Sequence, residues 1–348
     1  MWRERFGVST ALAIAVTVAA FVVAVVENLP FRDPDSLVGP TYVRLPTILG
    51  LAFLTDVLPR ALHRSHRAGS VRRAGSEFVA VTRERWSGDH VRFALLGLGS
   101  WYLTYVAFRN LKSYVPFVNP RLFDDAFARI DRVLFLGHDP AVLLHDLLGT
   151  GWAAHAMSLI YVAWIAMVPG VLASALVWSR DVSGGSWLVT AVGVDWVLGV
   201  ATYFVFPTVG PIYAEPAVFE TLAHTSVTTI QRTMIAERIE VLADPWATHA
   251  VQTIAAFASL HVGITVTVCV IAHLLRLHVW VRTALWVFLF LTVLSTVYLG
   301  WHYSVDALGG AVLGITAVWV GALATGNHVR GRPMHRQSSR SSEAVVSR

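Results

Sequence analysis

Two histidines and an aspartate near the C-terminal end have the types and spacing needed for nucleophilic and acid–base chemistry. His302 and Asp306 are four residues apart, so on a helix they share a face and can touch. A carboxylate that binds one ring nitrogen fixes the tautomer and leaves the other nitrogen as a nucleophile or base. His261 and Ser259 stand in the opening turns of an apolar segment, where free backbone N–H groups favour a phosphate.

Two such histidines suffice for a double displacement at phosphorus, in which one attacks and the other protonates the leaving oxygen. The residues alone leave two other interpretations open. The histidines could lie at lipid headgroup level without a catalytic role, or His261, His302 and Asp306 could hold a metal ion. The one cysteine, Cys269, lies in an apolar run, which excludes an intrachain disulfide and argues against a thiolate metal site.

These stretches resemble the signature motifs of the type 2 phosphatidic acid phosphatase superfamily. The second motif of that family, P-S-G-H, corresponds to residues 258–261, which read A-S-L-H. The third, S-R-x5-H-x3-D, corresponds to residues 295–306 with its spacing complete. The first, K-x6-R-P, corresponds to residues 112–120, where Lys112 is followed at that spacing by Asn119 and Pro120.

The departures from these motifs point to one branch of the family. Thr296 and Asn119 stand where the family has arginines. The forms S-L-H and S-T-x-Y-L-x-x-H-Y-x-x-D are instead similar to inositol phosphorylceramide synthases, which transfer a phosphorylated headgroup to a lipid alcohol instead of to water. Residues 206–211, F-P-T-V-G-P, resemble the F-P-x-x-x-P turn of the same branch.

The resemblance implies a role for each motif residue. His302 would be the nucleophile that forms a phosphohistidine, Asp306 would orient it, and His261 would be the general acid and base. Arg109 or Lys112 would have to supply the missing positive charge. Further contacts to phosphate or substrate are expected from the other motif residues, Ser259, Leu260, Asn119 and Tyr303. No cofactor and no metal are expected.

The elements that position these residues are expected to be membrane helices. Hydrophobic residues make up 55% of the 348 residues and charged residues 14%, whereas a soluble domain has about 25% charged residues. Eight apolar segments are present, at 8–27, 42–58, 91–108, 152–178, 186–206, 254–275, 281–299 and 304–325. The second is the weakest, because Arg44, Pro46 and Asp56 interrupt it. The predicted fold is an all-α polytopic membrane bundle of about eight transmembrane helices, six of which form a phosphatase-like catalytic core.

The basic segments predict the orientation of the bundle. The connection 59–90 has seven arginines against three acidic residues, and the tail after residue 327 is also rich in arginine. With eight spans, both lie on the same side as the N-terminus, and the positive-inside rule makes that side cytoplasmic. Both termini are then cytoplasmic, and the motif histidines lie at the extracytoplasmic face of the cell membrane. The first apolar segment is interpreted as a retained helix and not as a cleaved signal peptide.

The sequence divides into three regions: 1–108 with the N-terminal spans and the basic loop, 109–326 with the phosphotransferase-like membrane domain, and 327–348 as a disordered basic tail. An amphipathic helix is expected along the outer leaflet, although an ordinary loop helix remains an alternative. Its apolar positions are Phe123, Phe127, Ile130 and Leu134. Asp195 is interpreted as a buried hydrogen-bonding partner within the bundle, while His155 or Tyr161 could touch the substrate.

The predicted function is that of a metal-independent membrane phosphotransferase, which moves a phosphoryl group or a phosphorylated headgroup such as inositol phosphate from a lipid donor to an acceptor hydroxyl. One alternative is a phosphatase acting on lipid phosphates or polyprenyl pyrophosphates. A second is a non-enzymatic transporter or scaffold. The expected partners are a lipid-linked phosphate and the bilayer. Nucleic acid is excluded, because the arginines lie in short segments between apolar runs. The sequence carries no signal for an oligomeric state.

Overall fold

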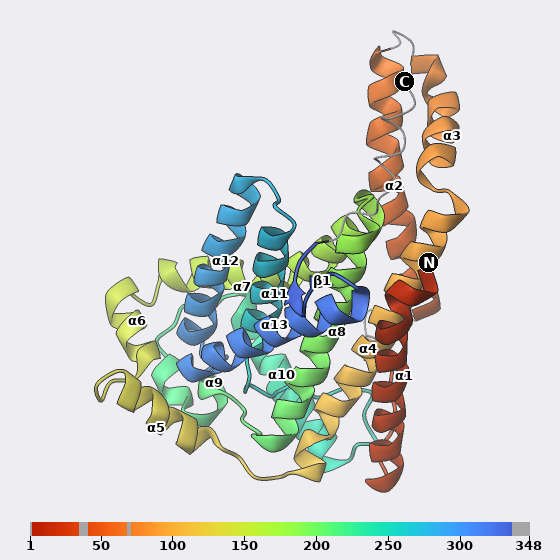
Figure 1. The fold of residues 1–348 in the computed structure, drawn as a ribbon. Helices are drawn as coiled ribbons and strands as arrows, with labels where there is room; N and C mark the ends of the chain where they lie inside the picture. Colours follow the sequence, from red (N-terminus) through yellow and green to blue (C-terminus); the bar gives the residue numbers. More distant parts are fainter. Residues whose placement is uncertain (1, 35–40, 68–70, 336–348) are drawn as a thin grey trace.

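The computed structural model describes residues 2–34, 41–67 and 71–335. Within these ranges the chain is mainly helical, with one pair of short strands, β1 (His328–Val329) and β2 (Arg332–Pro333) (Figure 1). The predicted all-α class is therefore confirmed. The basic tail begins with this strand pair, and residues 336–348 lie outside the described residues.

Thirteen α-helices and three short helical turns make up the described chain. In order, the α-helices are α1 (Trp2–Val26), α2 (Thr41–Arg67), α3 (Ala74–Arg85), α4 (Gly88–Val118), α5 (Asp124–Leu134), α6 (Pro140–Leu148), α7 (Trp152–Ala173), α8 (Val182–Val205), α9 (Pro211–Ala214), α10 (Ser226–Ala243), α11 (Leu260–Leu274), α12 (Val279–Tyr298) and α13 (Ser304–Thr325). The turns are η2 (Val71–Arg73), η3 (Ser174–Trp178) and η4 (Pro216–Phe219).

Six helical segments in the described ranges are long and apolar enough to cross a bilayer. They are Phe6–Val26, Gly88–Val118, Trp152–Trp178, Val182–Val205, Val279–Tyr298 and Ser304–Thr325. Each corresponds to a predicted span, so the chain is a multi-pass membrane protein. The two remaining predicted spans are different. The helix in 254–275 begins only at Leu260 and has 15 residues, short of the about 20 that a bilayer core needs. Helix α2 contains Pro46 and Pro59 and is not among the six.

Helix α1 runs parallel to α4, and this direction determines where the chain between them must go. The Phe6 and Phe93 rings lie 5.3 Å apart, and the Ser9 hydroxyl donates to that of Ser100 at 2.8 Å. Both contacts join the N-terminal part of α1 to the N-terminal part of α4. The chain between these parallel helices must therefore return to the end at which α1 began. There α2 and α3 form a helical hairpin that projects beyond the bundle (Figure 1).

Helix α8 is the centre of the bundle, and its residues 183–196 are all buried. It packs against α4, α11 and α13, and Trp187 Nε1 donates to the carbonyl of Val318 on α13 at 2.9 Å. Helices α11 and α13 approach each other through glycines. A Cβ on Gly310 or on Gly314 would collide with backbone carbonyls of the segment that begins and forms α11. This close packing holds the N-termini of α11 and α13 together, and these N-termini carry the motif histidines.

Candidate active site

The two motif histidines are in direct contact. His261 Nδ1 lies 3.1 Å from His302 Nε2, and His302 Nδ1 lies 3.1 Å from Asp306 Oδ2. A contact between two ring nitrogens needs one donor and one acceptor. When His302 Nδ1 donates to Asp306, His302 Nε2 carries a lone pair and accepts from the Nδ1–H of His261. In this tautomer, His302 Nε2 is the nitrogen that can attack a phosphorus atom.

Backbone hydrogen bonds fix the segment that carries His302. The amides of Trp301 and His302 both donate to the carbonyl of Thr296, at 2.9 and 3.3 Å. Tyr303 then caps α13, and its amide donates to Asp306 Oδ2 at 3.1 Å. The Asp306 side chain therefore closes the helix end and binds the His302 ring at the same time.

His261 is held in the first turn of α11. Ser259 is the N-cap of this helix, and its hydroxyl accepts from the amide of Val262 at 3.4 Å. Trp164 Nε1 on α7 donates to the carbonyl of His261 at 3.0 Å, and the two rings lie 4.2 Å apart. The N-terminus of α11 presents backbone N–H groups and a positive dipole end beside the histidine pair, as an anion site requires.

Aromatic rings cover one side of the histidine pair. The Tyr161 ring lies 5.0 Å from that of His261 and stacks on Trp301 at 5.0 Å and 7°. Trp301 Nε1 is buried without a hydrogen-bond partner among the described residues. His302 itself is only 5% exposed, so the nucleophile is shielded from bulk water. Of the two further candidates named from the sequence, Tyr161 lies in the site, whereas His155 is exposed and has a ring contact only with Trp152.

The positive charge near the histidines comes from α4. Lys112 Nζ lies 4.8 Å from the centre of the Tyr203 ring of α8. Arg109, one turn earlier, donates from Nη1 to the Tyr105 hydroxyl at 3.1 Å. The Nε of Arg109 is buried and has no partner in the described part of the chain. Unpaired donors on Arg109 and the ammonium of Lys112 can both bind a phosphate.

Four other predicted site residues have side chains engaged in the fold. The Ser259 hydroxyl is occupied as a helix cap, and the Leu260 side chain is buried against Gly199 of α8. Asn119 Nδ2 donates to the carbonyl of Phe204 at 2.8 Å and so ties the end of α4 to α8. The Tyr303 hydroxyl donates to Asp124 Oδ1 on α5 at 3.0 Å and is directed to that carboxylate.

Residues 299–303, which include the predicted nucleophile His302, form the catalytic segment. Two aspartates of α5 that were not among the predicted site residues hold this segment in place. Asp131 accepts from the Ser304 amide at 2.7 Å, from the Ser304 hydroxyl at 2.6 Å and from the Val305 amide at 3.1 Å. Asp124 accepts from the amide of Gly210 at 2.9 Å as well as from Tyr303. Burial raises the pKa of Asp131, while the bonds from Ser304 and Val305 act in the opposite direction.

The sequence carries only a spacing signal for these aspartates, and the structure adds their burial. Asp124 and Asp131 are seven residues apart, with Phe127 between them, so all three lie on one face of the helix. All three are buried. Ile130 and Leu134, which flank this buried face, are apolar and exposed, at 42% and 53%. Two charges on the buried face of a helix indicate partners that donate hydrogen bonds.

The turn that follows α8 packs directly under the catalytic segment. Gly210 has φ +91°, and a Cβ there would lie 2.6 Å from the carbonyl oxygen of Trp301. A backbone hydrogen bond also joins the two segments, because the Ile212 amide donates to the carbonyl of Gly300 at 2.9 Å. Glycine is therefore required at position 210 for both conformation and space.

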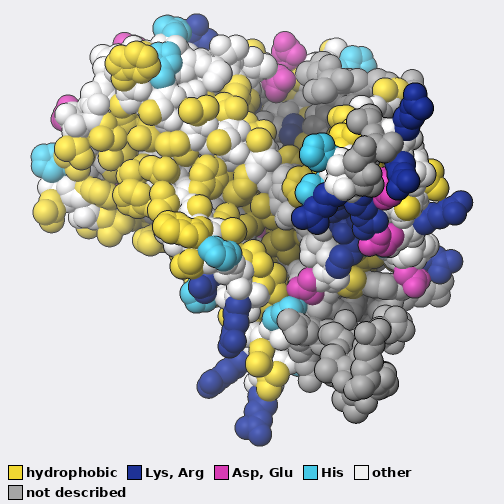
Figure 2. Space-filling view, turned by 90° about the horizontal axis from the view of Figure 1, so that it is seen from above, with side chains coloured by type: hydrophobic (Ala, Val, Ile, Leu, Met, Phe, Trp, Pro, Cys, Tyr) yellow, Lys and Arg dark blue, Asp and Glu magenta, His cyan; other side chains and the backbone are white. Residues whose placement is uncertain are grey.

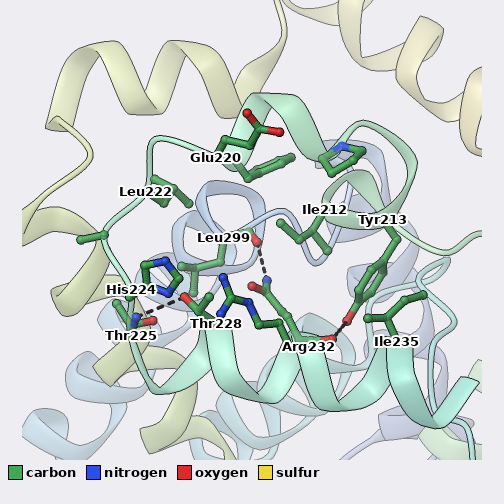
Figure 3. A pocket seen from close by; sticks show the side chains of 14 residues that line it. Ile212, Tyr213, Glu220, Leu222, His224, Thr225, Thr228, Arg232, Ile235 and Leu299 are labelled. Carbon is green, nitrogen blue, oxygen red and sulfur yellow. Dashed lines mark hydrogen bonds between the residues drawn. The ribbon is translucent and has the colours of Figure 1, made fainter.

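A cavity of about 450 Å³ lies on the other side of residues 299–301, between the 212–225 connection and α10 (Figure 3). Its floor is fixed by Gln231, whose Nε2 donates to the carbonyl of Leu299 at 2.8 Å. Glu220, His224 and Arg232 are among its lining residues, and neither motif histidine is. The cavity is thus a neighbour of the catalytic segment and is separate from the histidine pair.

Asp195 is fully buried in the centre of α8 and lies away from this end of the bundle. Its Oδ2 accepts from the Thr267 hydroxyl at 2.7 Å, and this hydroxyl is also within 3.1 Å of the carbonyl of Gly314. Asp195 therefore links α8, α11 and α13. Its other carboxyl oxygen has no partner among the described residues.

Among the described residues, no group of three or more His, Cys, Asp or Glu side chains could hold a metal ion. The family model described as PAP2 superfamily matches residues 125–320. This range includes His261, His302, Asp306 and Asp131 of α5, and it ends before the last turn of α13. Searches among curated proteins and among solved structures found no match.

Proposed function

The chain belongs to the PAP2 superfamily of lipid-phosphate phosphatases and phosphotransferases, and from this premise we propose that it transfers a phosphoryl group or phosphorylated headgroup from a lipid donor to an acceptor hydroxyl through His302. One observation carries the proposal. The His261 Nδ1 to His302 Nε2 contact of 3.1 Å places a proton donor and a nucleophilic nitrogen where one phosphorus centre can meet both.

In the first half-reaction, the donor phosphate displaces the hydrogen bond between the two rings. His302 Nε2 attacks phosphorus, a P–N bond forms, and the bond from phosphorus to the leaving oxygen breaks. His261 enters this step as the imidazolium, transfers its Nδ1 proton to that oxygen and becomes neutral imidazole, while the oxygen leaves as an alcohol. Asp306 binds the Nδ1–H of His302 and stabilises the positive charge that the ring acquires. Lys112, Arg109 and the N-terminus of α11 bind the phosphoryl oxygens.

The second half-reaction reverses these roles. His261, now neutral at the nitrogen that gave its proton, removes the proton of the acceptor hydroxyl. The acceptor oxygen attacks phosphorus, the P–N bond breaks, and His302 recovers its lone pair. Every step is a proton transfer or a displacement at phosphorus, and none needs a metal ion.

The burial of the nucleophile supports transfer to an alcohol over transfer to water. A covalent phosphohistidine that is covered by Tyr161, Trp164 and Trp301 meets few water molecules, so a bound acceptor competes well. The third-motif arginine of hydrolases in the family is Thr296 here, and its hydroxyl donates to the carbonyl of Val293 at 3.1 Å. Similarity to inositol phosphorylceramide synthases makes inositol phosphate the first headgroup to test.

The same proposal includes an orientation in the membrane. The histidine pair lies near the C-terminal end of α4, whereas the arginine-rich α2–α3 hairpin adjoins the N-terminal end of that helix. The two features are therefore at opposite ends of a 31-residue span. Because arginine-rich connections stay in the cytoplasm, we place the active site at the extracytoplasmic face and the N-terminus inside.

Purified protein incubated with a phospholipid labelled at phosphorus tests the proposal, with and without candidate alcohols. A new labelled lipid that forms only with an alcohol supports the transferase. Release of free phosphate alone would indicate a phosphatase. A labelled protein band that is stable to alkali and lost in acid would report the phosphohistidine, and it should be missing in His302→Ala. No turnover of any phospholipid and no labelled band would refute the enzyme.

A further inference from the structure

Three arginines surround one buried carboxylate where the α2–α3 hairpin joins the bundle. Asp56 has no exposed surface. Arg85 binds it with two nitrogens, Nε to Oδ2 at 2.8 Å and Nη2 to Oδ1 at 2.7 Å. Arg60 Nη1 lies 2.7 Å from Oδ1, and Arg180 Nη2 lies 3.5 Å from Oδ2. Three positive charges against one negative charge leave an excess of two.

Among the described residues, Asp56 is the one acidic side chain that forms an ion pair with these three guanidiniums. Glu84 forms its own ion pair with Arg64 at 2.8 Å, further along the hairpin. Asp181 follows Arg180 in the chain, but it caps α8 and binds His335 at 2.8 Å. The remaining hydrogen bond to Asp56 comes from Trp86 Nε1, which is neutral.

The three arginines differ in how many guanidinium nitrogens bind within the cluster and in how exposed their side chains are. Arg85 is largely buried, and besides the carboxylate it binds the carbonyl of Trp178 at 3.0 Å. Arg60 and Arg180 each touch the carboxylate with one nitrogen, and their side chains are 41% and 38% exposed. Both therefore have N–H donors directed away from Asp56. Two partly exposed guanidiniums on either side of one carboxylate can bind a phosphate group.

The span boundaries put this cluster at the level of lipid headgroups. Arg180 lies in the short turn between the spans Trp152–Trp178 and Val182–Val205. Arg85 comes three residues before the span Gly88–Val118. Trp178 is 41% exposed beside the cluster, which is typical of a tryptophan at the membrane–water interface.

The part of α2 before Asp56 also carries exposed apolar residues. On α2, the residues before Asp56 lie on the bundle side of the cluster, and three apolar ones are exposed: Ile48 at 56%, Leu51 at 58% and Leu54 at 43%. Figure 2, which views the end with the projecting hairpin, shows basic side chains gathered on the hairpin side of this face, whereas the broad hydrophobic surface lies on its other side. The basic cluster matches the negative headgroup of an amphiphile.

We propose that Arg60 and Arg180 bind the phosphate of an anionic phospholipid in the leaflet opposite to the active site. The acyl chains of this lipid extend from the cluster into the leaflet beside α2. The bound headgroup balances the excess charge at Asp56 and fastens the hairpin to the membrane surface. This site is independent of the proposed phosphotransferase reaction, because it lies at the other end of α4.

Native mass spectrometry of the delipidated full chain tests the site. The protein is titrated with dioleoyl phosphatidylglycerol, with dioleoyl phosphatidylcholine, or with inorganic phosphate. We expect wild type to retain phosphatidylglycerol in preference to phosphatidylcholine, and we expect this preference to fall about fivefold for each arginine removed in Arg60→Gln and Arg180→Gln. The matched control is Arg64→Gln, which removes an arginine of the same hairpin from a balanced ion pair and should keep the preference.

Three results would overturn the proposal: equal binding of the two lipids by wild type, an unchanged preference in the double variant, or displacement of phosphatidylglycerol by inorganic phosphate at the same concentration. The last result would identify a site for free phosphate. If the double variant does not fold, Arg180→Gln alone decides, because its contact to Asp56 is the longest of the three and its loss leaves the bonds from Arg85 and Arg60 in place.

Discussion

Replacing Asp131 by asparagine is the sharpest test of how the active site is held. Asp131 lies on α5 and touches neither histidine, but its three hydrogen bonds end on Ser304 and Val305, immediately after the catalytic segment. The side chain is 3% exposed, so water cannot replace a lost partner. Asparagine keeps the shape of the side chain and removes the charge and one acceptor.

The magnitude follows from the geometry. Oδ2 of Asp131 accepts from the Ser304 amide, and Oδ1 accepts from the Ser304 hydroxyl and the Val305 amide. In either orientation, the side-chain amide of the Asp131→Asn variant would place an N–H donor against a backbone N–H donor. One hydrogen bond to a charged group contributes about 1.5–3 kcal/mol. If the His302 segment loses that much preorganisation, the kcat falls roughly 10- to 100-fold.

The assay is steady-state transfer with labelled lipid, together with a thermal unfolding curve in detergent. We expect a reduced kcat with little change in KM, because Asp131 is a positioning residue that does not contact the substrate. Asp125→Asn is the matched control, since Asp125 is exposed on the same helix and should have nearly wild-type activity. A folded Asp131→Asn protein with a kcat within twofold of wild type would refute the role of α5.

The pH dependence of stability gives a second readout for the same residue. Because burial raises the pKa of Asp131, the folded protein holds this proton more tightly than the unfolded chain does. The free energy of unfolding should therefore decrease as the pH rises from the ordinary aspartate pKa of about 4 to the raised pKa of the folded state. An asparagine side chain has no such proton to lose, so the Asp131→Asn variant should lack this contribution.

Other predictions test the chemistry, the packing and the orientation. His302→Ala should lower turnover by several orders of magnitude and leave the protein folded, and near-native activity would refute the assignment of the nucleophile. Activity should survive EDTA, and inactivation that added metal reverses would favour a metal site. Gly210→Ala should lower the free energy of unfolding by about 1–3 kcal/mol, because the added Cβ would meet the Trp301 carbonyl. The thermal midpoint and the activity should both fall. With Cys269 replaced by serine, an impermeant thiol reagent should label Ala217→Cys on intact cells and Ser76→Cys only after lysis, and the reverse pattern would place the chemistry in the cytoplasm.

The histidine pair could be predicted from the sequence because its chemistry depends on short spacings. His302 and Asp306 are four positions apart, so a local contact could be expected, although in the structure His302 precedes the N-cap Tyr303 and the capped end of α13 makes the contact. The contact between His261 and His302 needs more, since they are 41 positions apart in the chain. The predicted placement at the same end of two neighbouring helices was sufficient to bring them together, and glycines such as Gly310 and Gly314 complete the approach.

The supporting residues could not be predicted in the same way, because their partners are set by tertiary packing. Asp124 and Asp131 look like the polar face of an amphipathic helix, yet in the structure they are buried and bind backbone amides far away in the sequence. The converse holds for Asn119 and Tyr303. Motif position suggested contacts with the substrate, but the side chain of Asn119 binds the carbonyl of Phe204 and that of Tyr303 binds Asp124.

The two missing arginines of the family motifs have a structural explanation. Position 296 is 1% exposed, and its backbone carbonyl receives the amides of Trp301 and His302, so the segment passes close by and leaves little space for a long charged side chain. Position 119 ends α4 and joins it to α8. A phosphate at His302 must therefore obtain its positive charge elsewhere. Lys112 and Arg109 are one turn apart on α4. We propose that these two residues supply the charge that arginines would supply at positions 119 and 296.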